Sequence, residues 1–271
     1  MKKLLQTIAM LITLVCLPFA AYAEEAVPEV KYSAAVDEIF DRGNINGTLV
    51  VYDADANTCY IHNAERAAQR FYPASTFKIF NSLIGLNVHA VKNVDEYFYK
   101  YMGEPVYLES WQNDANLRLA IKRSQVPAYK ELARRIGRPA MQANLNLLQY
   151  GNMEIGEHLD SFWLQGPLKI SALEQVQLLT YLAQQKLPYD KSAQAQVAAI
   201  TVLEQNKNYT LHGKTGWATE NIDTPVGWFV GWVEAKGNTY VFALNMDLQD
   251  ANDLPLRESL TLECLKALKA I

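Results

Sequence analysis

Residues 73–83 read Pro73-Ala74-Ser75-Thr76-Phe77-Lys78-Ile79-Phe80-Asn81-Ser82-Leu83. Pro73 ends an extended approach, and Ser75 and Thr76 are residue types that favour the N-terminus of a helix. The apolar residues from Phe77 onward predict a helix that is buried over most of its surface. Helical residues three apart share a face, so the Ser75 hydroxyl and the Lys78 amine are expected to be neighbours.

A serine beside a lysine predicts nucleophilic chemistry only under one condition. The hydroxyl becomes a good nucleophile when a base takes its proton, and Lys78 can be that base only if burial or chemistry removes its positive charge. Backbone N–H groups at the helix start would stabilise negative charge that develops beside Ser75. Alone, Ser-x-x-Lys equally describes a capping serine followed by a lysine that reaches solvent, so the rest of the chain decides.

The first 23 residues have the pattern of a secretory signal peptide. Lys2 and Lys3 form a charged start, residues 4–19 are mostly apolar, and Ala21-Tyr22-Ala23 is typical of a cleavage site. The apolar run is short for a membrane span and no stop-transfer segment follows, which disfavours an N-terminal membrane anchor. We therefore predict export to the periplasm, cleavage after Ala23 and no membrane attachment afterwards.

The remaining residues, 24–271, are enough for one large core or two closely packed lobes. Half of the whole chain is hydrophobic (50%) and its formal net charge is −4. No basic run or patch is present, so a nucleic-acid partner is not expected. Scattered charge without repeats, low-complexity tracts or a Pro/Gly-rich linker indicates a globular protein with no sharp domain boundary.

Metal chemistry and thiol chemistry find little support in the sequence. The four histidines are widely separated and no Cys-x-x-Cys is present, so no metal site is predicted and a zinc hydrolase is disfavoured. The absence of G-x-S-x-G argues against an α/β-hydrolase. Cys59 and Cys264 remain after signal removal, and the sequence leaves open whether they form a disulfide.

Hydrophobic periodicity divides the chain into strands near both ends and helices between them. The expected strands are Gly47–Tyr52, Thr58–His62, Tyr209–Gly213, Val226–Glu234 and Thr239–Asn245. The expected helices are Ala34–Asp41, one starting at Ser75, Leu117–Lys122, Ala128–Ile136, Ala140–Leu148, Ala172–Gln185, Ala193–Glu204 and Leu256–Ala270. This order predicts an α/β (α+β) fold in which an antiparallel sheet, made by both chain ends, is flanked by helices.

The same order predicts a mainly helical lobe inserted in the middle of the chain. We place this lobe at about residues 71–204, and the mixed lobe that contains the sheet at about 24–70 and 205–271. A cleft between two such lobes is a usual place for a ligand site.

Four further motifs follow the serine–lysine pair. They are Ser124-Gln125-Val126, Tyr150-Gly151-Asn152, Phe162-Trp163-Leu164 and Lys214-Thr215-Gly216-Trp217. Taken singly, each has an ordinary structural explanation: a helix break, a turn, a core aromatic residue and a strand end. Their occurrence together, in this order after Ser-Thr-Phe-Lys, is far more specific.

This combination resembles the class D (oxacillinase-type) serine β-lactamases over essentially the whole mature chain. Further markers are Lys169-Ile170-Ser171, Gly227-Trp228-Phe229-Val230-Gly231-Trp232 and Leu254-Pro255-Leu256-Arg257. Phe80 departs from the proline or small aliphatic residue usual after Ser-x-x-Lys-Ile, which affects local packing rather than chemistry. The class A pattern fits poorly, because Ser124-Gln125-Val126 stands where Ser-Asp-Asn would be expected. The implied fold is that of serine β-lactamases and penicillin-binding proteins.

The resemblance implies hydrolysis of β-lactam antibiotics, and resistance to them, through an acyl-enzyme on Ser75. Lys78 is implied to carry CO₂ as a carbamate and to act as general base in acylation and deacylation. The residues implied to form the pocket around this amine are Phe77, Val126, Trp163 and Leu164. An apolar pocket keeps the amine neutral enough to capture CO₂, and the Trp163 indole N–H would hold a carbamate oxygen. No other cofactor and no metal is implied.

The remaining implied roles concern proton transfer and substrate binding. Ser124 would pass a proton to the lactam nitrogen with help from Lys214, and backbone N–H groups of Ser75 and Trp217 would form the oxyanion hole. The residues implied to bind substrate are Thr215 and Arg257 at its carboxylate, and Trp111, Gly216 and Trp217 along the cleft. Those expected near the site in a structural role are Tyr150, Gly151 and Asn152.

Two alternatives share parts of this pattern. A penicillin-sensing receptor domain acylates the same serine without turnover, but such domains usually follow a multi-span membrane region. A penicillin-binding transpeptidase or carboxypeptidase shares Ser-x-x-Lys and Lys-Thr-Gly, and often carries extra domains or a membrane anchor. The single signal-like segment and the short chain favour an exported enzyme that binds β-lactams. Its oligomeric state, monomer or homodimer, is left open. The preferred β-lactam, carbapenem hydrolysis and inhibitor sensitivity are left open.

Overall fold

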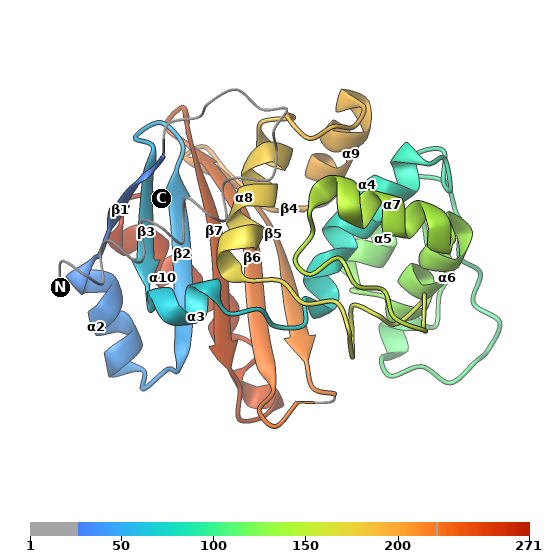
Figure 1. The fold of residues 1–271 in the computed structure, drawn as a ribbon, viewed down its shortest axis with the longest axis horizontal. Coiled ribbons are helices and arrows are strands. Elements are labelled where there is room, and N and C mark those ends of the chain that lie inside the picture. Colours follow the sequence, from blue (N-terminus) through green and yellow to red (C-terminus); the bar gives the residue numbers. More distant parts are fainter. Residues whose placement is uncertain (1–26, 221) are drawn as a thin grey trace.

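The central sheet is built from segments near both ends of the chain (Figure 1). The computed structural model describes residues 27–220 and 222–271, so the expected signal peptide at residues 1–23 lies outside the described residues. Within the described part, the sheet has seven strands in the order β1-β3-β2-β7-β6-β5-β4. The strands are β1 (Glu29–Lys31), β2 (Gly47–Asp53), β3 (Thr58–His62), β4 (Val202–Gln205), β5 (Tyr209–Ala218), β6 (Val226–Ala235) and β7 (Asn238–Asp247). The expectation of one sheet with flanking helices is confirmed.

The sheet is mixed rather than purely antiparallel. β1 runs parallel to β3, whereas all other neighbouring strands pair antiparallel. The sequence did not predict β1, because three residues are too few for an alternating pattern to be recognised. The antiparallel expectation is therefore wrong at this edge.

Side chains alternate along β6 between two separate cores. Trp228, Val230 and Trp232 join the hydrophobic cluster on one face of the sheet, whereas Phe229 and Val233 join the cluster on the other. A strand that is apolar on both faces is typical of a sheet covered on both sides. The double coverage explains why nearly all of β6 is buried.

Helices cover both faces of the sheet (Figure 1). α2 (Ala34–Arg42) and α10 (Leu256–Ala267) pack on one face, and α3 (Ala64–Ala68) and α8 (Ala172–Ala183) pack on the other. α8 falls inside the segment 71–204 that the sequence assigned to the helical lobe. It nevertheless contacts β2, β6 and β7, so part of that segment serves as a cover for the sheet.

The helical lobe lies beside β5 and surrounds one central helix (Figure 1). Its helices are η1 (Ala74–Phe77), α4 (Lys78–Asn87), η2 (Glu109–Trp111), α5 (Leu117–Lys122), α6 (Val126–Ile136), α7 (Arg138–Leu148) and α9 (Lys191–Ile200), and the short η3 (Ala251–Asp253) precedes α10. Every residue of α4 from Lys78 to Leu86 is buried, and the helix contacts α5, α6 and α9. A helix that is mostly apolar all round is expected at such a position.

β5 is longer than the sequence predicted. It continues from the expected end at Gly213 to Ala218, because all of its residues pair in register with β6. β4 pairs only with the first part of β5, between Thr210 and His212. Lys214-Thr215-Gly216 therefore lies inside a strand, on an edge that β4 does not cover.

Helix α9 is shorter than the sequence predicted. It ends at Ile200 instead of continuing to Glu204. Thr201 donates its hydroxyl hydrogen to the Ala198 carbonyl (2.9 Å), and the β-branched Val202 then starts β4. From Val202 the chain pairs with β5 instead of continuing the helix. Local periodicity in the sequence does not reveal such long-range pairing.

The two cysteines lie in different cores. Cys59 lies in β3 and joins the cluster on the α8 face, whereas Cys264 lies in α10 and joins the cluster on the opposite face. No disulfide joins Cys59 to Cys264, which answers the question left open by the sequence. Burial raises the pKa of the Cys264 thiol to about 12, so this thiol stays protonated at neutral pH.

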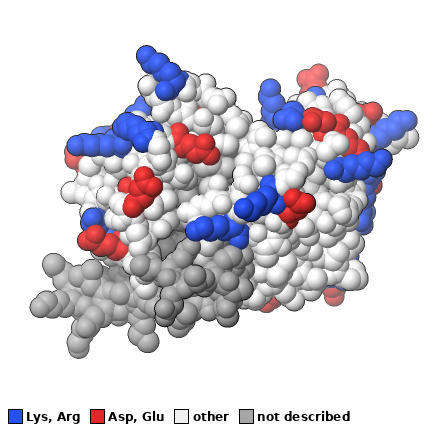
Figure 2. All heavy atoms as spheres, turned by 90° about the horizontal axis from the view of Figure 1, so that it is seen from above, with Lys and Arg blue, Asp and Glu red and all other residues white. Residues whose placement is uncertain are grey.

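The surface carries charges of both signs. Figure 2 shows one face of the molecule, on which Lys and Arg side chains are interspersed among Asp and Glu rather than gathered in one region. Among residues 27–220 and 222–271, no helix combines the length and the apolar character needed to cross a membrane.

The motif Tyr150-Gly151-Asn152 connects the end of α7 to residues 167–169 by hydrogen bonds. The Asn152 backbone N–H donates to the Lys169 carbonyl (3.0 Å), and the Lys169 N–H donates to Asn152 Oδ1 (2.9 Å). The Asn152 amide also donates to the Pro167 carbonyl (2.8 Å). Gly151 has φ +55°, and a Cβ there would lie 1.9 Å from the Lys169 carbonyl oxygen. Only glycine fits this close approach.

We expect Gly151→Ala to lower the free energy of unfolding by about 3 kcal/mol, because the added Cβ combines left-handed strain with a backbone clash. Gly237→Ala is the matched control, since Gly237 also has positive φ (+83°) but its Cβ would meet no atom within 4 Å. The control should lose only about 1 kcal/mol. Urea denaturation measures both losses, and equal losses would show that the clash with Lys169 is not important.

Candidate active site

Ser75 lies in η1, the short turn that leads into α4. Thr76 fixes this turn, because its hydroxyl donates to the Pro73 carbonyl (2.7 Å) and accepts from the Gln175 amide of α8 (2.8 Å). Ala74 has φ +47°, in the left-handed region that non-glycine residues rarely adopt. The conformation costs about 1–2 kcal/mol, so the surrounding contacts must hold it.

The Lys78 amine lies beside two serine hydroxyls. Lys78 Nζ is 2.5 Å from Ser75 Oγ and 3.4 Å from Ser124 Oγ. The Tyr129 ring lies on another side of the amine, with its centroid 5.5 Å from Nζ. The structure therefore brings together three residues that the sequence singled out, although Ser124 is distant from the other two along the chain.

Burial controls the charge of Lys78. The side chain is fully buried, with 0% exposure. Burial lowers the pKa of Lys78 well below its usual value, and the positive charge of nearby Lys214 lowers it further. A buried ammonium without a partner costs several kcal/mol, so the neutral amine is the favoured form. Lys78 thus meets the condition that the sequence set for a base.

The four residues expected around the Lys78 amine differ in how deeply they are buried. Phe77 and Trp163 are fully buried, with ring centroids 5.7 Å apart. Val126, the first residue of α6, and Leu164 are half-buried. The Trp163 indole N–H is buried and has no hydrogen-bond acceptor among the described residues. Because an unpaired buried donor is costly, an acceptor oxygen next to Trp163 would be stabilising.

Ser124 occupies a strained position between α5 and α6. Its φ is +49°, and its backbone N–H donates to the Ile121 carbonyl (3.1 Å). Trp111 packs beside this loop, half-buried, and its indole N–H donates to the Arg123 carbonyl (2.9 Å). Trp111 therefore contacts the residue before Ser124, and its place along a substrate cleft stays a prediction.

The edge of β5 forms the second wall of the site. β5 contacts η1, and a Cβ on Gly216 would lie 3.0 Å from the Pro73 carbonyl oxygen. Glycine at this position allows the strand to approach the turn that carries Ser75. Trp217 follows on the same strand, half-buried and paired in register with Gly227 of β6.

Lys214 is a second buried lysine, and its pKa is close to neutral pH. Burial lowers the pKa of Lys214 to about 7, and the charge of Arg257 acts in the same direction. Lys214 Nζ donates to the Thr215 carbonyl (3.0 Å) and lies 3.4 Å from the Thr215 hydroxyl. The amine can therefore change its charge near neutral pH, and it lies next to a hydroxyl that can donate a hydrogen bond.

Arg257 joins the start of α10 to the β5 motif. Its Nη1 donates to the Gly216 carbonyl (2.7 Å) and its Nε donates to the Leu254 carbonyl (2.7 Å). Gly227 leaves room for this side chain, because a Cβ there would lie 2.9 Å from Arg257 Cδ. Burial lowers the pKa of Arg257 to about 10, so the guanidinium stays charged at neutral pH.

Two residues that support the site, Tyr129 and Gln175, were not singled out from the sequence. The Tyr129 hydroxyl lies 2.8 Å from Ser82 Oγ, which donates to the Lys78 carbonyl (2.8 Å). Gln175 supports the turn that carries Ser75 through its bond to Thr76. The apolar face of α6 could have placed Tyr129 towards the core, but no local signal shows that this core contains the lysine.

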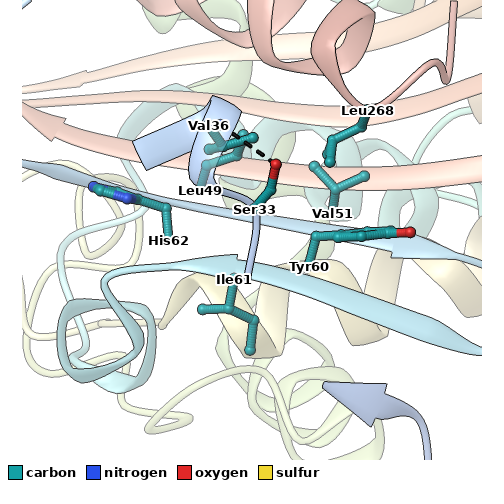
Figure 3. Close-up of a pocket in the computed structure, with 8 residues that line it drawn as sticks. All are labelled: Ser33, Val36, Leu49, Val51, Tyr60, Ile61, His62 and Leu268. Atoms are coloured by element: carbon teal, nitrogen blue, oxygen red, sulfur yellow. Dashed lines mark hydrogen bonds between the residues drawn. The ribbon is translucent and has the colours of Figure 1, made fainter. Parts of the chain in front are cut away.

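A separate pocket lies on the α2 face of the sheet (Figure 3). His62 lies on its wall, with Nδ1 2.6 Å from an Asp37 carboxylate oxygen. Ser33 also lines the pocket, but its hydroxyl oxygen accepts the Val36 backbone N–H (3.4 Å) as the cap of α2. Ser33, Asp37 and His62 are thus explained as parts of the helix start and its packing.

Known proteins match this chain over most of its length. Residues 41–266 match the family model described as the penicillin binding protein transpeptidase domain. Beta-lactamase OXA-5 of Pseudomonas aeruginosa is 40% identical over 243 residues, covering 89% of this chain and 91% of its own. Beta-lactamase OXA-48 of Klebsiella pneumoniae is 40% identical over 232 residues, covering 86% and 87%.

Solved structures show the same likeness in three dimensions. The crystal structure of FUS-1 (OXA-85), a class D β-lactamase from Fusobacterium nucleatum subsp. polymorphum, has a TM-score of 0.88 and 55% sequence identity. The match covers 89% of this chain and 100% of that one. Since fold and sequence agree over most of the chain, the protein belongs to the class D β-lactamases and is a β-lactamase hydrolase.

Proposed function

We propose that the enzyme hydrolyses β-lactams, and so confers resistance to them, through an acyl-enzyme on Ser75. One observation carries the proposal: the fully buried Lys78 amine lies 2.5 Å from Ser75 Oγ and 3.4 Å from Ser124 Oγ. A neutral Lys78 amine can take the proton of the Ser75 hydroxyl, and the Ser124 hydroxyl is close enough to pass a proton to the substrate.

Each later step is assigned to a group of this chain. Ser75 Oγ attacks the lactam carbonyl as its proton leaves towards Lys78, and the C–N bond of the ring then breaks. Ser124 passes its proton to the lactam nitrogen, helped by Lys214, and takes up in return the proton held at the Lys78 position. Backbone N–H groups of Ser75 and Trp217 stabilise the oxyanion. Water, deprotonated at the Lys78 position, finally attacks the acyl carbonyl; the ester bond to Ser75 Oγ breaks, and the proton from the Lys78 position returns to Ser75 Oγ.

The surroundings of Lys78 fit a carbamate formed with CO₂. CO₂ adds only to a neutral amine, and burial keeps Lys78 in that form. The Trp163 indole N–H, which lacks an acceptor among the described residues, can donate to an added oxygen. Phe77, Val126 and Leu164 exclude water from this space. When bound, CO₂ supplies a carboxylate-like base, and no other cofactor and no metal is proposed.

The substrate carboxylate is proposed to bind at the β5 edge. Arg257 supplies a charged guanidinium, Thr215 a hydroxyl, and Lys214 a further positive charge when protonated. Gly216 lets the strand lie close to the turn that carries Ser75, and Trp111, which is bonded to the residue before Ser124, is proposed to line the cleft.

Export to the periplasm and cleavage after Ala23 also remain proposals. They are supported by the charged start and apolar run of residues 1–23. The proposed partners are β-lactam molecules, and the proposed assembly is a monomer or homodimer.

Turnover tests the proposal against the alternative of a receptor domain that acylates once. Purified enzyme mixed with a chromogenic cephalosporin should continue hydrolysis far beyond one equivalent. Ser75→Ala should show no turnover and no penicilloyl adduct by mass spectrometry, because the attacking oxygen is gone. Ser259→Ala, at an exposed serine of α10, should behave like the parent enzyme. A full adduct on the Ser75 variant would disprove the nucleophile.

Arg257→Ala should lower kcat/KM for benzylpenicillin about tenfold to a hundredfold, as expected for loss of a charge-assisted contact. Arg118→Ala is a matched control, because Arg118 forms an exposed ion pair with Asp95. A benzylpenicillin ester lacks the carboxylate, so Arg257→Ala should change its hydrolysis much less. If acid and ester lost the same factor, the effect of Arg257 would be structural.

Activity should depend on dissolved CO₂. At mildly acidic pH, degassed enzyme should slow during turnover, because acid protonates the Lys78 amine and CO₂ that is lost is not replaced. Added bicarbonate should restore a linear rate. ¹³CO₂ should give a carbamate carbon signal by NMR that disappears in Lys78→Ala and persists in Lys214→Ala. A linear full rate in degassed enzyme together with no signal would rule out the carbamate.

A further inference from the structure

Gln125 is a fully buried side chain next to Ser124. Its amide Nε2 donates to the Trp111 carbonyl (2.9 Å) and to the Asn113 carbonyl (2.8 Å). Two carbonyl acceptors require both amide hydrogens, which determines the orientation of the amide. The backbone N–H of Gln125 in turn donates to the Ala120 carbonyl (2.8 Å). Gln125 is therefore fixed at both its side chain and its backbone.

The residue before Ser124 is held by the same segment. The Trp111 indole N–H donates to the Arg123 carbonyl (2.9 Å), and Arg123 Nη1 donates to the Asp114 carbonyl (3.3 Å). Four side chain–backbone hydrogen bonds thus join residues 111–114 to the two neighbours of Ser124. We name this set, made by Trp111, Asn113, Asp114, Arg123 and Gln125, the 111–125 clamp.

Ser124 is the residue that requires such a clamp. Its φ of +49° lies in the left-handed region, which costs energy for any residue with a Cβ. Strained conformations of this kind persist only when the surrounding structure fixes them. The Ser124 hydroxyl is already 3.4 Å from Lys78 Nζ, so a relaxation of φ towards negative values would move it out of reach of the amine.

We propose that Gln125 is a positioning residue for proton transfer: its buried amide, bonded to Trp111 and Asn113, holds Ser124 left-handed and keeps its hydroxyl beside Lys78. The proposal rests on the proposed function, because it assigns to Gln125 an effect on the step in which Ser124 protonates the lactam nitrogen. Gln125 itself does not touch substrate. It also links the segment that carries Trp111 mechanically to the proton-transfer residue.

The test uses Gln125→Met, which retains the side-chain volume but removes both donors. Gln194→Met is the matched control. Gln194 is also fully buried, and its Nε2 donates to two backbone carbonyls, those of Leu187 (3.1 Å) and Tyr189 (2.9 Å), but it lies in α9. Both variants should lose thermal stability. Only Gln125→Met should lose kcat/KM, by about tenfold to a hundredfold, because misplacement of a catalytic group slows the chemical step.

Single-turnover kinetics with benzylpenicillin give the more specific result. Gln125→Met should slow acylation, in which Ser124 delivers its proton, and should leave deacylation nearly unchanged. In a Ser124→Ala background, Gln125→Met should change the acylation rate less than about twofold, because residues that act through one another are not additive.

The outcomes separate this proposal from the function on which it rests. Equal losses from Gln125→Met in the Ser124 and Ser124→Ala backgrounds, with normal turnover by the parent enzyme, would overturn the positioning role alone. Losses of the same size in Gln194→Met would do the same, since they would reflect stability. An absence of β-lactam turnover in the parent enzyme would overturn the proposed function and the role of Gln125 together.

Discussion

An uncharged lysine in the protein interior is the constraint on which the rest of the site depends. Lys78 is the first residue of α4, a helix buried on all sides. The energetic penalty of an unpaired buried ammonium drives the amine to its neutral form. That neutrality is what the proposed roles of Lys78, as base for Ser75 and as acceptor for CO₂, require. The surrounding helices α5, α6 and α9 therefore contribute to the chemistry, because they keep water away from the Lys78 side chain.

The site forms where this helical lobe meets the edge of the sheet. The approach is close because Gly216 lacks a side chain opposite the Pro73 carbonyl, and because the Trp228 indole N–H of β6 donates to the Tyr72 carbonyl (2.9 Å) just before η1. Burial lowers the pKa of both lysines at this boundary; in addition, the charge of Lys214 disfavours a charge on Lys78, and the charge of Arg257 disfavours a charge on Lys214. An anionic substrate would relieve this repulsion, which links substrate binding to the protonation of Lys214.

Backbone strain occurs at two positions beside the Lys78 amine. Ala74 and Ser124 both have positive φ, and both lie next to or within the serine–lysine cluster. The hydrogen bonds of Thr76 with Gln175 and of Gln125 with residues 111–113 hold these turns. Such an arrangement fixes side-chain directions more tightly than an unstrained loop does, and it places the requirement for rigidity on residues that never contact substrate.

The sequence by itself determined the local relations. The neighbouring positions of Ser75 and Lys78 follow from helical geometry, the residues Val226–Glu234 predict a strand, and the order of the motifs indicates the family. Only the tertiary structure decided that β5 extends to Ala218, that β1 runs parallel to its neighbour, and that Cys59 and Cys264 lie on opposite faces of the sheet. It also placed Ser124 beside Lys78 and directed Arg257 onto the Gly216 carbonyl. The reason is physical: periodicity and turn chemistry act over a few residues, whereas strand pairing, desolvation and contacts between distant segments arise only when the whole chain packs.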